Sequence, residues 1–424
     1  MNIAMFANAY KPVIGGLENS IATFTDDLRA MNHNVLIVTL AFSGAEKSDE
    51  QIFRLPAVKK VAGTQFSMRV PAPAGLSERL DLFEPEVIHS HHPFMVGDTA
   101  LRAARERRLP VLFTHHTMYE RYAYLFSRNS QALERIAAAI PTEYANLCDM
   151  VVAPTGSIRD LIRSRGVSVP IEVVPTGVDV EMYSGGDGKS FRKRNRIPED
   201  AFVLGYLGRV VEAKNMRFVV ETAIGFLSQC RDARFLVVGE GDYMPELRRM
   251  IKSAGVDSRV VITGSLEGRP VADAYSAMDA FLFASKTETQ GIVLIESFCA
   301  GVPVVGLDAQ ATRDIVEDGK SGILLDDNNA AGDFVEQIKR LKNDTEFRRQ
   351  LARGAKKRAL DFDRKDCASR LLEVYRHLQK KNVAADAPEP DLMSAMRQRF
   401  SAEWDLFKEK LSVMGSAIND QGDV

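Results

Sequence analysis

The sequence predicts an α/β protein in which two doubly wound, Rossmann-like parallel sheets face each other across a cleft. Short apolar runs of strand length alternate with helical stretches over most of the chain, and this alternation is typical of parallel sheets that are covered by helices on both faces. A chain of 424 residues is also too long for a single hydrophobic core. We therefore expect two such sheets, each with its own core.

The first sheet is predicted from apolar runs in the N-terminal part of the chain. These runs are too short for helices and are mostly apolar, as expected of strands buried on both faces. They occupy residues 3–6, 35–39, 87–90, 111–114 and 151–153. Helical patterns lie between them, for example over residues 20–31 and 97–108.

The second sheet is predicted from a similar series that begins near residue 202. Its strands occupy residues 202–207, 234–238, 260–263, 280–283, 304–306 and 322–325. The Pro-Thr-Gly-Val-Asp run at 175–179 and the glycine-rich run at 185–188 separate the two series and are typical of a linker. Because ligands of open α/β sheets bind at the carboxyl ends of the strands, we expect the functional site in the cleft between the sheets.

The composition excludes several classes of protein. The formal net charge is −2, and no segment is basic enough to predict nucleic acid as a partner. Cys148, Cys230, Cys299 and Cys367 are too widely spaced for a zinc site or a disulfide framework, which fits a reducing cytoplasm. We expect no signal peptide and no membrane-spanning helix, because no apolar run approaches about 20 residues.

Two glutamates, Glu288 and Glu296, lie in an otherwise apolar run. A buried carboxylate is costly unless it is paired or hydrogen-bonded, so both are candidate binding groups. Glu288 precedes Gly291, where a loop is expected to become a helix, and Glu296 follows about two turns later. An ionised carboxylate only accepts hydrogen bonds, which suits the hydroxyl groups of sugars and riboses. The alternative is an amphipathic helix with two surface glutamates.

The start of that helix is a candidate site for an anion. The amides of Gly291, Ile292 and Val293 open the helix, and an N-terminus directs unpaired N–H donors at a negative group such as a diphosphate. Gly264 follows a neighbouring strand, and we expect the backbone there to shape the pocket of a nucleotide base.

Two cations lie near the carboxyl end of the first strand of the second sheet. Arg209 ends this strand and Lys214 follows five residues later. This spacing predicts a clamp for a diphosphate, whose negative charge grows when it leaves. The alternative is a solvated surface pair.

Gly15 and Gly16 follow the first strand of the chain and precede a helix. Glycine allows backbone N–H groups to approach a phosphate closely, and the helix N-terminus favours negative charge there. An ordinary glycine turn is the alternative. The pattern is not G-x-G-x-x-G, so it does not indicate a nicotinamide cofactor.

Five of the seven histidines cluster in two strand-end loops, namely His89, His91, His92, His115 and His116. Histidine is the commonest metal ligand, but no cysteine or carboxylate in the sequence is placed to complete a site. The donor side offers no convincing Asp-x-Asp metal site, because Asp326 and Asp327 are expected in a late turn away from the donor-side loops. We therefore predict no metal and no other cofactor.

Several of these motifs resemble one known family. The Glu-x7-Glu spacing of Glu288 and Glu296, followed by Ser-Phe-Cys-Ala-Gly-Val-Pro-Val-Val, resembles the signature of the retaining nucleotide-sugar glycosyltransferases of family 4, which have the GT-B fold. The GGLE segment at 15–18, GRVVEAKN at 208–215, FTHHTM at 113–118 and PTGVD at 175–179 are also similar to motifs of this family. The resemblance covers roughly residues 1–380. Asn215 replaces the glycine that is usual in the family motif.

The resemblance implies a division of the chain and a role for each motif. We expect an N-terminal acceptor-side domain (1–177), a nucleotide-sugar domain (178–365), a helix that crosses back to the first domain (366–382), and a linker with an amphipathic tail helix (383–424). The implied catalytic residues are His116, Glu288, Arg209 and Lys214. The implied donor-binding residues are Gly15, Gly16, Arg209, Lys214, Gly264, Glu288, Gly291, Ile292, Val293 and Glu296, and those on the acceptor side are His91, His92 and Tyr119.

The implied reaction moves a hexosyl unit, expected to be glucosyl, from a UDP-sugar to an acceptor hydroxyl without a metal. The anomeric configuration is retained, which gives an α-glycosidic bond. Residues 116–125 (HTMYERYAYL) resemble a segment of diacylglycerol glucosyltransferases, so the expected acceptor is a membrane lipid such as diacylglycerol. A soluble sugar or a glycan precursor is the alternative acceptor. A sugar-nucleotide epimerase and an inactive binding homologue are further alternatives.

The location of the protein follows from the same reasoning. We expect a cytoplasmic enzyme that associates peripherally with the inner face of the plasma membrane. Arginines over residues 102–108 could contact anionic lipid, although a solvated helix face explains them equally well. Apolar residues at helical spacing over 391–415 predict the tail helix, which could dock on the protein, on a partner or at a membrane interface. The sequence does not predict the oligomeric state.

Overall fold

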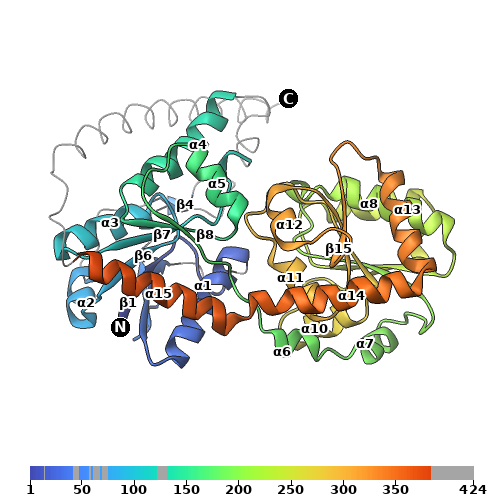
Figure 1. The fold of residues 1–424 in the computed structure, drawn as a ribbon, viewed down its shortest axis with the longest axis horizontal. Coiled ribbons are helices and arrows are strands. Elements are labelled where there is room, and N and C mark those ends of the chain that lie inside the picture. Colours follow the sequence, from blue (N-terminus) through green and yellow to red (C-terminus); the bar gives the residue numbers. More distant parts are fainter. Residues whose placement is uncertain are drawn as a thin grey trace.

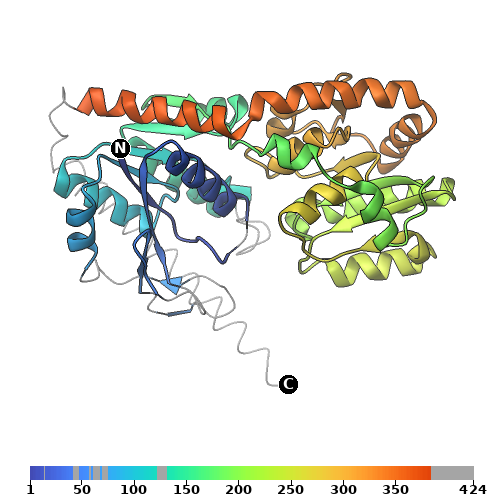
Figure 2. The same cartoon turned by 90° about the horizontal axis from the view of Figure 1, so that it is seen from below.

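The computed structural model describes residues 1–13, 15–41, 47–56, 59–60, 67–68, 75–121 and 131–382. These residues form two α/β lobes that lie side by side, and the helices at the end of the described chain run along both of them (Figures 1 and 2). The predicted tail at 383–424 lies outside the described residues. None of the helices in the described ranges is long and apolar enough to cross a membrane.

The N-terminal lobe contains a seven-stranded sheet in which neighbouring strands are parallel. Its order is β3 (Ile52–Leu55), β2 (Asn34–Leu40), β1 (Asn2–Phe6), β6 (Val87–Ser90), β7 (Val111–Thr114), β8 (Met150–Ala153) and β9 (Ile171–Val173). A separate antiparallel pair consists of β4 (Lys59–Lys60) and β5 (Ser67–Met68). The five predicted strands are present, and β3 and β9 at the two edges were not predicted.

Helices cover both faces of this sheet. They are α1 (Gly16–Ala30), α2 (Leu76–Phe83), α3 (Val96–Arg107), α4 (Gln131–Asn146), α5 (Gly156–Ser164) and α15 (Arg364–Asn382). Successive side chains of a strand point to opposite faces. Ala4 and Phe6 of β1 therefore pack in one core with α3 and α5, whereas Ile3 and Met5 pack in another core with α1 and α15.

The C-terminal lobe contains a six-stranded parallel sheet. Its order is β12 (Val260–Ile262), β11 (Ala233–Val238), β10 (Phe202–Leu207), β13 (Ala280–Phe283), β14 (Val304–Leu307) and β15 (Gly322–Leu325). All six strands occur where the sequence predicts them, with bounds that differ by at most one residue.

Helices also cover both faces of the second sheet. They are α6 (Val180–Ser184), α7 (Gly188–Arg194), α8 (Met216–Gln229), α9 (Met244–Ser253), α10 (Arg269–Ser276), α11 (Ile292–Cys299), α12 (Gln310–Ile315), α13 (Ala331–Asn343) and α14 (Thr345–Ala359). Short 3₁₀ turns lie at Glu212–Lys214, Asp257–Arg259 and Leu360–Phe362. One core packs under α8, α9 and α13, and the other packs under α7, α10, α11 and α14.

The chain passes between the lobes twice, and the two crossings lie against each other. The amide of Val178 donates to the carbonyl of Phe362 at 2.9 Å, and the amide of Arg364 donates to the carbonyl of Val178 at 3.1 Å. A side chain at Gly177 would collide with the backbone of Arg364, so glycine allows this close approach. After the second crossing α15 packs on α1 (Figure 2). The predicted α/β fold with two doubly wound sheets is confirmed, while the exact boundaries 177/178, 365/366 and 382/383 stay a proposal.

The strand order places the predicted motifs at the centre of each sheet. The direction of strand succession reverses between β1 and β6 in the first sheet, and between β10 and β13 in the second. A crevice forms at the carboxyl ends of strands at such a reversal. The loops that follow these four strands carry Gly15 and Gly16, His91, Arg209 and Glu288, respectively.

Candidate active site

Lys214 and Glu288 form an ion pair at the carboxyl ends of β10 and β13. Both side chains are largely buried, each with an exposed fraction of 17%. Burial pushes the pKa of Glu288 upward, but Lys214, the hydroxyl of Ser285 and Arg209 outweigh burial and hold that pKa below its usual value. Glu288 is therefore an ionised acceptor at neutral pH, and Lys214 is directed at it.

The residue that follows Lys214 is the one that departs from the family motif. Asn215 adopts a left-handed backbone conformation, with φ of 56°. Asparagine tolerates this conformation better than most residues, and its side-chain amide donates to the carbonyl of Ala284 at 3.2 Å. Asparagine thus replaces glycine here without moving Lys214 away from the cleft.

Arg209 is exposed at the end of β10. Its charge lowers the pKa of Glu288 in the same lobe, and it also acts on Glu18 of α1 in the opposite lobe. Burial is the main cause that raises the pKa of Glu18, and Arg209 partly offsets it. Arg209 therefore lies near acidic side chains of both lobes.

The glycine loop that faces Arg209 leads into α1. Gly15 is the residue before this helix, and Gly16 is its exposed first residue. A side chain at Gly15 would collide with the carboxylate of Glu18. Glycine at position 15 thus leaves room for this carboxylate, and the contact of Gly15 and Gly16 with a phosphate stays a prediction.

Glu296 lies on α11 and accepts two hydrogen bonds from tyrosines. Tyr183 of α6 and Tyr275 of α10 donate to separate carboxylate oxygens, each at 2.8 Å. Burial raises the pKa of Glu296, and the two tyrosine hydrogen bonds offset this effect only in part. The sequence predicted the glutamate but not its partners, which orient both oxygens.

Gly291 precedes α11 in a left-handed conformation, with φ of 81°. This conformation strongly favours glycine, and it lets the amides of Ile292 and Val293 open the helix. The preceding residue, Gln290, is buried and forms hydrogen bonds with Thr176 in the segment where the chain first passes between the lobes. Its side chain accepts from the amide of Thr176 at 2.8 Å and donates to the carbonyl of the same residue at 2.7 Å. The loop that carries Glu288 is therefore fixed to the connection between the lobes.

The loops at the ends of β10, β11 and β12 pack closely together. The amide of Gly239 donates to the carbonyl of Gly264 at 2.8 Å. A side chain at Gly239 would collide with the carbonyl of Gly208. Gly264 itself is half-buried, and no contact joins it to Glu288 or Lys214 among the interactions of the described residues. Its expected contact with a nucleotide base stays a prediction.

His116 faces the C-terminal lobe from the loop after β7. Its carbonyl oxygen accepts a hydrogen bond from the Thr289 hydroxyl at 2.8 Å. Its Nε2 atom lies 2.9 Å from Nδ1 of His91, and the rings stack with centroids 5.1 Å apart. Burial is the main cause that holds the pKa of both histidines well below the usual value. Both rings are therefore neutral at neutral pH.

The other two residues predicted for the acceptor side, His92 and Tyr119, link the loops that follow β1, β6 and β7. His92 accepts from the amide of Asn8 at 3.1 Å, and Tyr119 packs edge-on against Phe94 with ring centroids 5.4 Å apart. His89 contacts the Tyr375 hydroxyl at 2.6 Å and the Thr114 hydroxyl at 2.7 Å. No group of three histidine, cysteine or carboxylate side chains in the described ranges could hold a metal ion.

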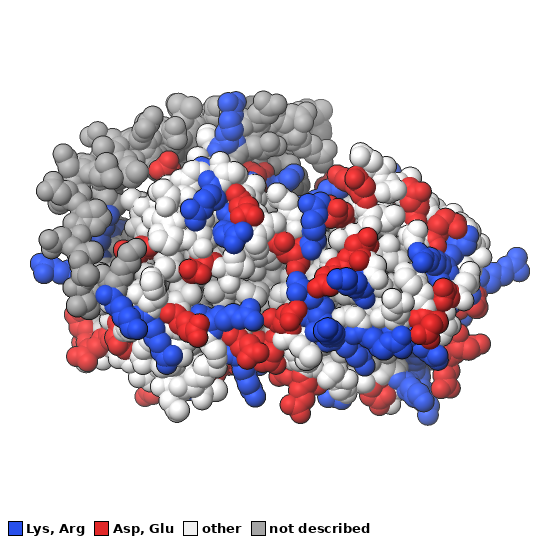
Figure 3. All heavy atoms as spheres, in the orientation of Figure 1, with Lys and Arg blue, Asp and Glu red and all other residues white. Residues whose placement is uncertain are grey.

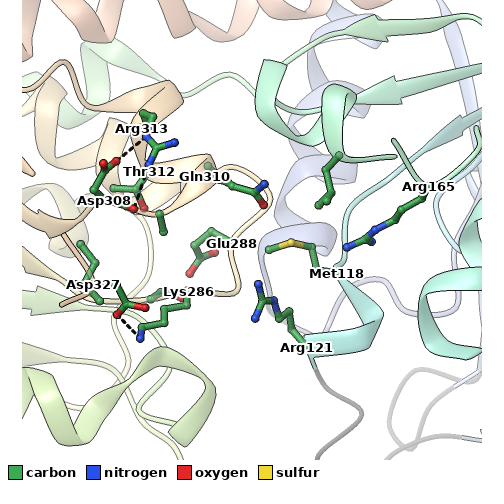
Figure 4. Close-up of a pocket in the computed structure, with 15 residues that line it drawn as sticks. Met118, Arg121, Arg165, Lys286, Glu288, Asp308, Gln310, Thr312, Arg313 and Asp327 are labelled. Carbon is green, nitrogen blue, oxygen red and sulfur yellow. Dashed lines mark hydrogen bonds and ion pairs between the residues drawn. The ribbon is translucent and has the colours of Figure 1, made fainter. Parts of the chain in front are cut away.

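A cavity of about 350 Å³ lies between the lobes beside Glu288 (Figure 4). Met118, Arg121, Leu161 and Arg165 line it from the N-terminal lobe. The other lining residues come from the C-terminal lobe: Ser285, Lys286, Glu288, Leu307, Asp308, Ala309, Gln310, Ala311, Thr312, Arg313 and Asp327. The expectation that Asp327 lies away from the site is wrong, because β15 ends beside the loop after β13 and Asp327 pairs with Lys286.

One face of the protein carries charges of both signs. Figure 3 shows lysines and arginines interspersed with aspartates and glutamates on the face it presents, in line with the net charge of −2.

Comparison with known proteins identifies the family. Residues 14–182 match the family model described as Glycosyltransferase Family 4, and residues 187–358 match the model described as Glycosyl transferases group 1. A D-inositol 3-phosphate glycosyltransferase of Catenulispora acidiphila is 30% identical over 308 residues, which cover 69% of this chain and 72% of the relative. An alpha-monoglucosyldiacylglycerol synthase of Acholeplasma laidlawii is 25% identical over 397 residues, which cover 90% and 98%.

A solved structure agrees with the fold. The crystal structure of Anabaena HepE in complex with UDP superposes with a TM-score of 0.71 at 19% identity, and the match covers 89% of this chain and all of that one. Sequence motifs, sheet order and both family models thus lead to one assignment: the chain is a glycosyltransferase that belongs to family 4 and has the GT-B fold.

Proposed function

We propose that the protein transfers a glucosyl unit from a UDP-sugar to a hydroxyl of a membrane lipid such as diacylglycerol, with retention of the anomeric configuration. The observation that carries this proposal is the arrangement of Arg209, Lys214 and Glu288 around one end of the cleft, opposite His116. The monoglucosyldiacylglycerol synthase named above supports the lipid acceptor, and the UDP complex of HepE supports the donor nucleotide.

The C-terminal lobe holds the donor. The ribose hydroxyls donate to Glu296, whose two oxygens Tyr183 and Tyr275 keep in place. Each hydrogen bond to an ionised carboxylate contributes about 1.5–3 kcal/mol. The nucleotide base lies against the backbone near Gly264, and hydroxyls of the hexose donate to Glu288.

The diphosphate lies between the lobes, where positive groups converge. Arg209 and Lys214 bind its oxygens, and the amides of Ile292 and Val293 at the start of α11 add the positive end of the helix dipole. The backbone of Gly15 and Gly16 closes the site from the opposite lobe. Because negative charge on the diphosphate grows as the bond to the sugar breaks, these fixed groups stabilise the transition state more than the bound donor.

The acceptor attacks from the same face that the diphosphate leaves. The acceptor oxygen bonds to the anomeric carbon, the bond from this carbon to the phosphate oxygen breaks, and that oxygen takes the acceptor proton. The carbonyl of His116 steadies the positive charge that develops on the sugar. Of the described residues that line the cavity from the N-terminal lobe, none is a carboxylate that could act as a nucleophile, which supports this front-face route and thus retention.

The proposed acceptor places the enzyme at the inner face of the plasma membrane, where a lipid and a nucleotide sugar meet. His91, His92 and Tyr119 shape the acceptor side by holding the loops after β6 and β7. A soluble sugar or glycan precursor is the alternative acceptor.

The test is an assay of nucleotide release from UDP-glucose, UDP-galactose and GDP-mannose, each with diacylglycerol micelles and with soluble sugars. We expect release of UDP from UDP-glucose, dependent on diacylglycerol, with an α-linked glycolipid identified by NMR. A β-linked product would contradict retention. Absence of release from any donor with any acceptor would contradict the transferase itself.

A further inference from the structure

The two tyrosines that bind Glu296 come from different surroundings. Tyr275 is fully buried on α10 and donates to Oε2 at 2.8 Å. Tyr183 is only half-buried and donates to Oε1 at the same distance. It lies on α6, the first helix after the chain enters the C-terminal lobe, and α6 packs on α10 and α11 (Figure 1). One of the two supports of Glu296 thus comes from the junction between the lobes.

The tyrosines leave the carboxylate of Glu296 with a defined capacity for a ligand. An ionised carboxylate has about four acceptor positions, two on each oxygen. Of the described residues, only the two tyrosines donate to this carboxylate, one to each oxygen. Each oxygen therefore keeps one position, and both oxygens are held in place. Two neighbouring donors fit this arrangement, and the 2′- and 3′-hydroxyls of a ribose are such a pair.

The position of α6 depends on both passages of the chain between the lobes. Asp179 begins this helix: its side chain accepts from the amide of Met182 at 2.8 Å, and its carbonyl accepts from the amide of Tyr183 at 3.1 Å. Arg364 of the second passage lies 3.8 Å from the carboxylate of Asp179. The Nε atom of Arg364 also donates to both oxygens of Asp27, at 2.8 and 2.9 Å. Because Asp27 is buried on α1, Arg364 joins the N-terminal lobe to the start of α6.

We propose that Tyr183 is a positioning residue that makes the nucleotide site selective for ribose over 2′-deoxyribose, and that Arg364 makes this selectivity depend on how the lobes meet. The inference rests on one part of the proposed function, the hydrogen bonds from the ribose hydroxyls to Glu296. It is independent of the base, of the transferred sugar and of the acceptor. Tyr183 acts through Glu296 and not on the ribose itself.

The selectivity follows from a carboxylate that cannot turn. A 2′-deoxyribose leaves one oxygen of Glu296 with an unused acceptor position when water is displaced, and an unsatisfied charged acceptor is costly. When Tyr183 is replaced by phenylalanine, Tyr275 alone holds the carboxylate, which can then turn toward the hydroxyl that remains. The difference between ribose and deoxyribose therefore shrinks although Glu296 is still present.

A purely structural role for Tyr183 leads to another result. If its hydroxyl only satisfied a buried carboxylate, Tyr183→Phe would be less stable than the wild-type protein. The ratio of the affinities for ribonucleotide and deoxyribonucleotide would then stay the same, because both ligands would meet the same carboxylate.

The test is a calorimetric titration of UDP and 2′-deoxy-UDP, and of GDP and 2′-deoxy-GDP, into the wild-type protein and its variants. We expect the wild-type protein to bind one of the ribonucleotides at least about tenfold more tightly than its deoxy form, or about 1.4 kcal/mol. Tyr183→Phe should lower this ratio about three- to tenfold, mainly by weakening the ribonucleotide. Arg364→Gln should lower it about two- to threefold, because its ion pair with Asp179 is partly exposed. In the double variant Arg364→Gln should add nothing.

Tyr144→Phe is the matched control for the loss of a tyrosine hydroxyl. The hydroxyl of Tyr144 is buried in the N-terminal lobe, where it donates to Ser90 at 2.7 Å and to the carbonyl of Gly97 at 3.0 Å. This variant should lose stability but change the ratio less than about twofold.

Three outcomes would overturn the role of Tyr183: equal binding of both forms by the wild-type protein, an unchanged ratio in Tyr183→Phe, or an equal fall in Tyr144→Phe. An effect of Arg364→Gln that keeps its full size in the double variant would overturn the link between the lobes. If Tyr183→Phe does not fold, an unchanged ratio in Arg364→Gln overturns the proposal. The titrations need neither turnover nor an acceptor, so selective binding without release of UDP from UDP-glucose would contradict the proposed function alone.

Discussion

Thr289 of the C-terminal lobe donates a hydrogen bond to the carbonyl oxygen of His116 in the N-terminal lobe, at 2.8 Å. The carbonyl of Thr289 in turn accepts from the Thr155 hydroxyl at 3.1 Å. Thr289 is the residue that follows Glu288, so the proposed sugar-binding loop is attached to the proposed catalytic loop across the cleft. This hydrogen bond is therefore one of the contacts that join the two lobes, together with that from the amide of Ser157 to Asp314.

Replacing Thr289 by valine should lower kcat about three- to tenfold, because one hydrogen bond of about 0.5–1.5 kcal/mol is lost and His116 is held less firmly. UDP affinity should change little, since the ribose and diphosphate groups remain. Thr289→Ser keeps the hydroxyl and should restore most of the rate. Steady-state kinetics with calorimetry checks both, and an equal loss in the serine variant would show that the hydroxyl does not matter.

Lys214→Ala should lower turnover about 10²- to 10³-fold, because a fixed cation at the leaving diphosphate is removed. The variant also leaves Glu288 without its partner. In the wild-type protein the pKa of Glu288 is lowered. The ionised Glu288 side chain therefore stabilises the folded protein above the ordinary carboxyl pKa, and this stabilisation is lost as the pH falls through the pKa of Glu288 in the folded state.

The stability difference between wild type and Lys214→Ala should therefore be larger at pH 7 than at pH 4, and thermal unfolding at both values measures it. Near-normal turnover in this variant would remove Lys214 from the mechanism. A stability difference that does not depend on pH would show that the ion pair with Glu288 is not the source.

Glu296→Gln should weaken UDP binding about 10- to 100-fold, since hydrogen bonds from ribose to a charged acceptor contribute about 1.5–3 kcal/mol. The effect of Glu296→Gln on stability should change with pH in the direction opposite to that of Lys214→Ala. Burial raises the pKa of Glu296, so ionisation of this side chain destabilises the folded protein. The loss of stability is absent at pH values below the pKa of the unfolded state, and it grows as the pH rises through the pKa of the folded state.

The free energy of unfolding of Glu296→Gln relative to wild type should thus increase from pH 4 to pH 8 in the absence of nucleotide. Denaturant unfolding across this range gives the slope. Unchanged UDP affinity would place the ribose elsewhere, whatever the unfolding data show.

The rate should survive treatment with EDTA, because Arg209, Lys214 and the start of α11 supply the positive charge that a metal supplies in other transferases. The assay is UDP release before and after dialysis against EDTA, with added Mg²⁺ as the control. A large loss that Mg²⁺ restores would assign the diphosphate to a metal.

The sequence predicted the central strands well, because runs buried on both faces are continuously apolar and are bounded by turns. It missed β3 and β9, which are short edge strands whose polar Arg54 and Glu172 interrupt the pattern. The predicted groups Arg209, Lys214 and Glu288 come together because strand order at a reversal fixes which loops meet.

The partners of these groups could not be predicted from the sequence. Tyr183 and Tyr275 reach Glu296 from 113 and 21 residues away, and Gln290 reaches Thr176 over 114 residues. Such contacts depend on how the helices pack on a sheet and on how the lobes meet. The local hydrophobic periodicity of the sequence predicts neither. For the same reason Asp327 was placed away from a cavity that it lines.

The most direct test of the account is a crystal structure of the protein with UDP bound. We expect the diphosphate within hydrogen-bonding distance of Arg209 and Lys214, and the ribose hydroxyls on the Glu296 carboxylate. UDP bound outside the cleft, or bound within it with neither Arg209 nor Lys214 on the diphosphate, would contradict the account.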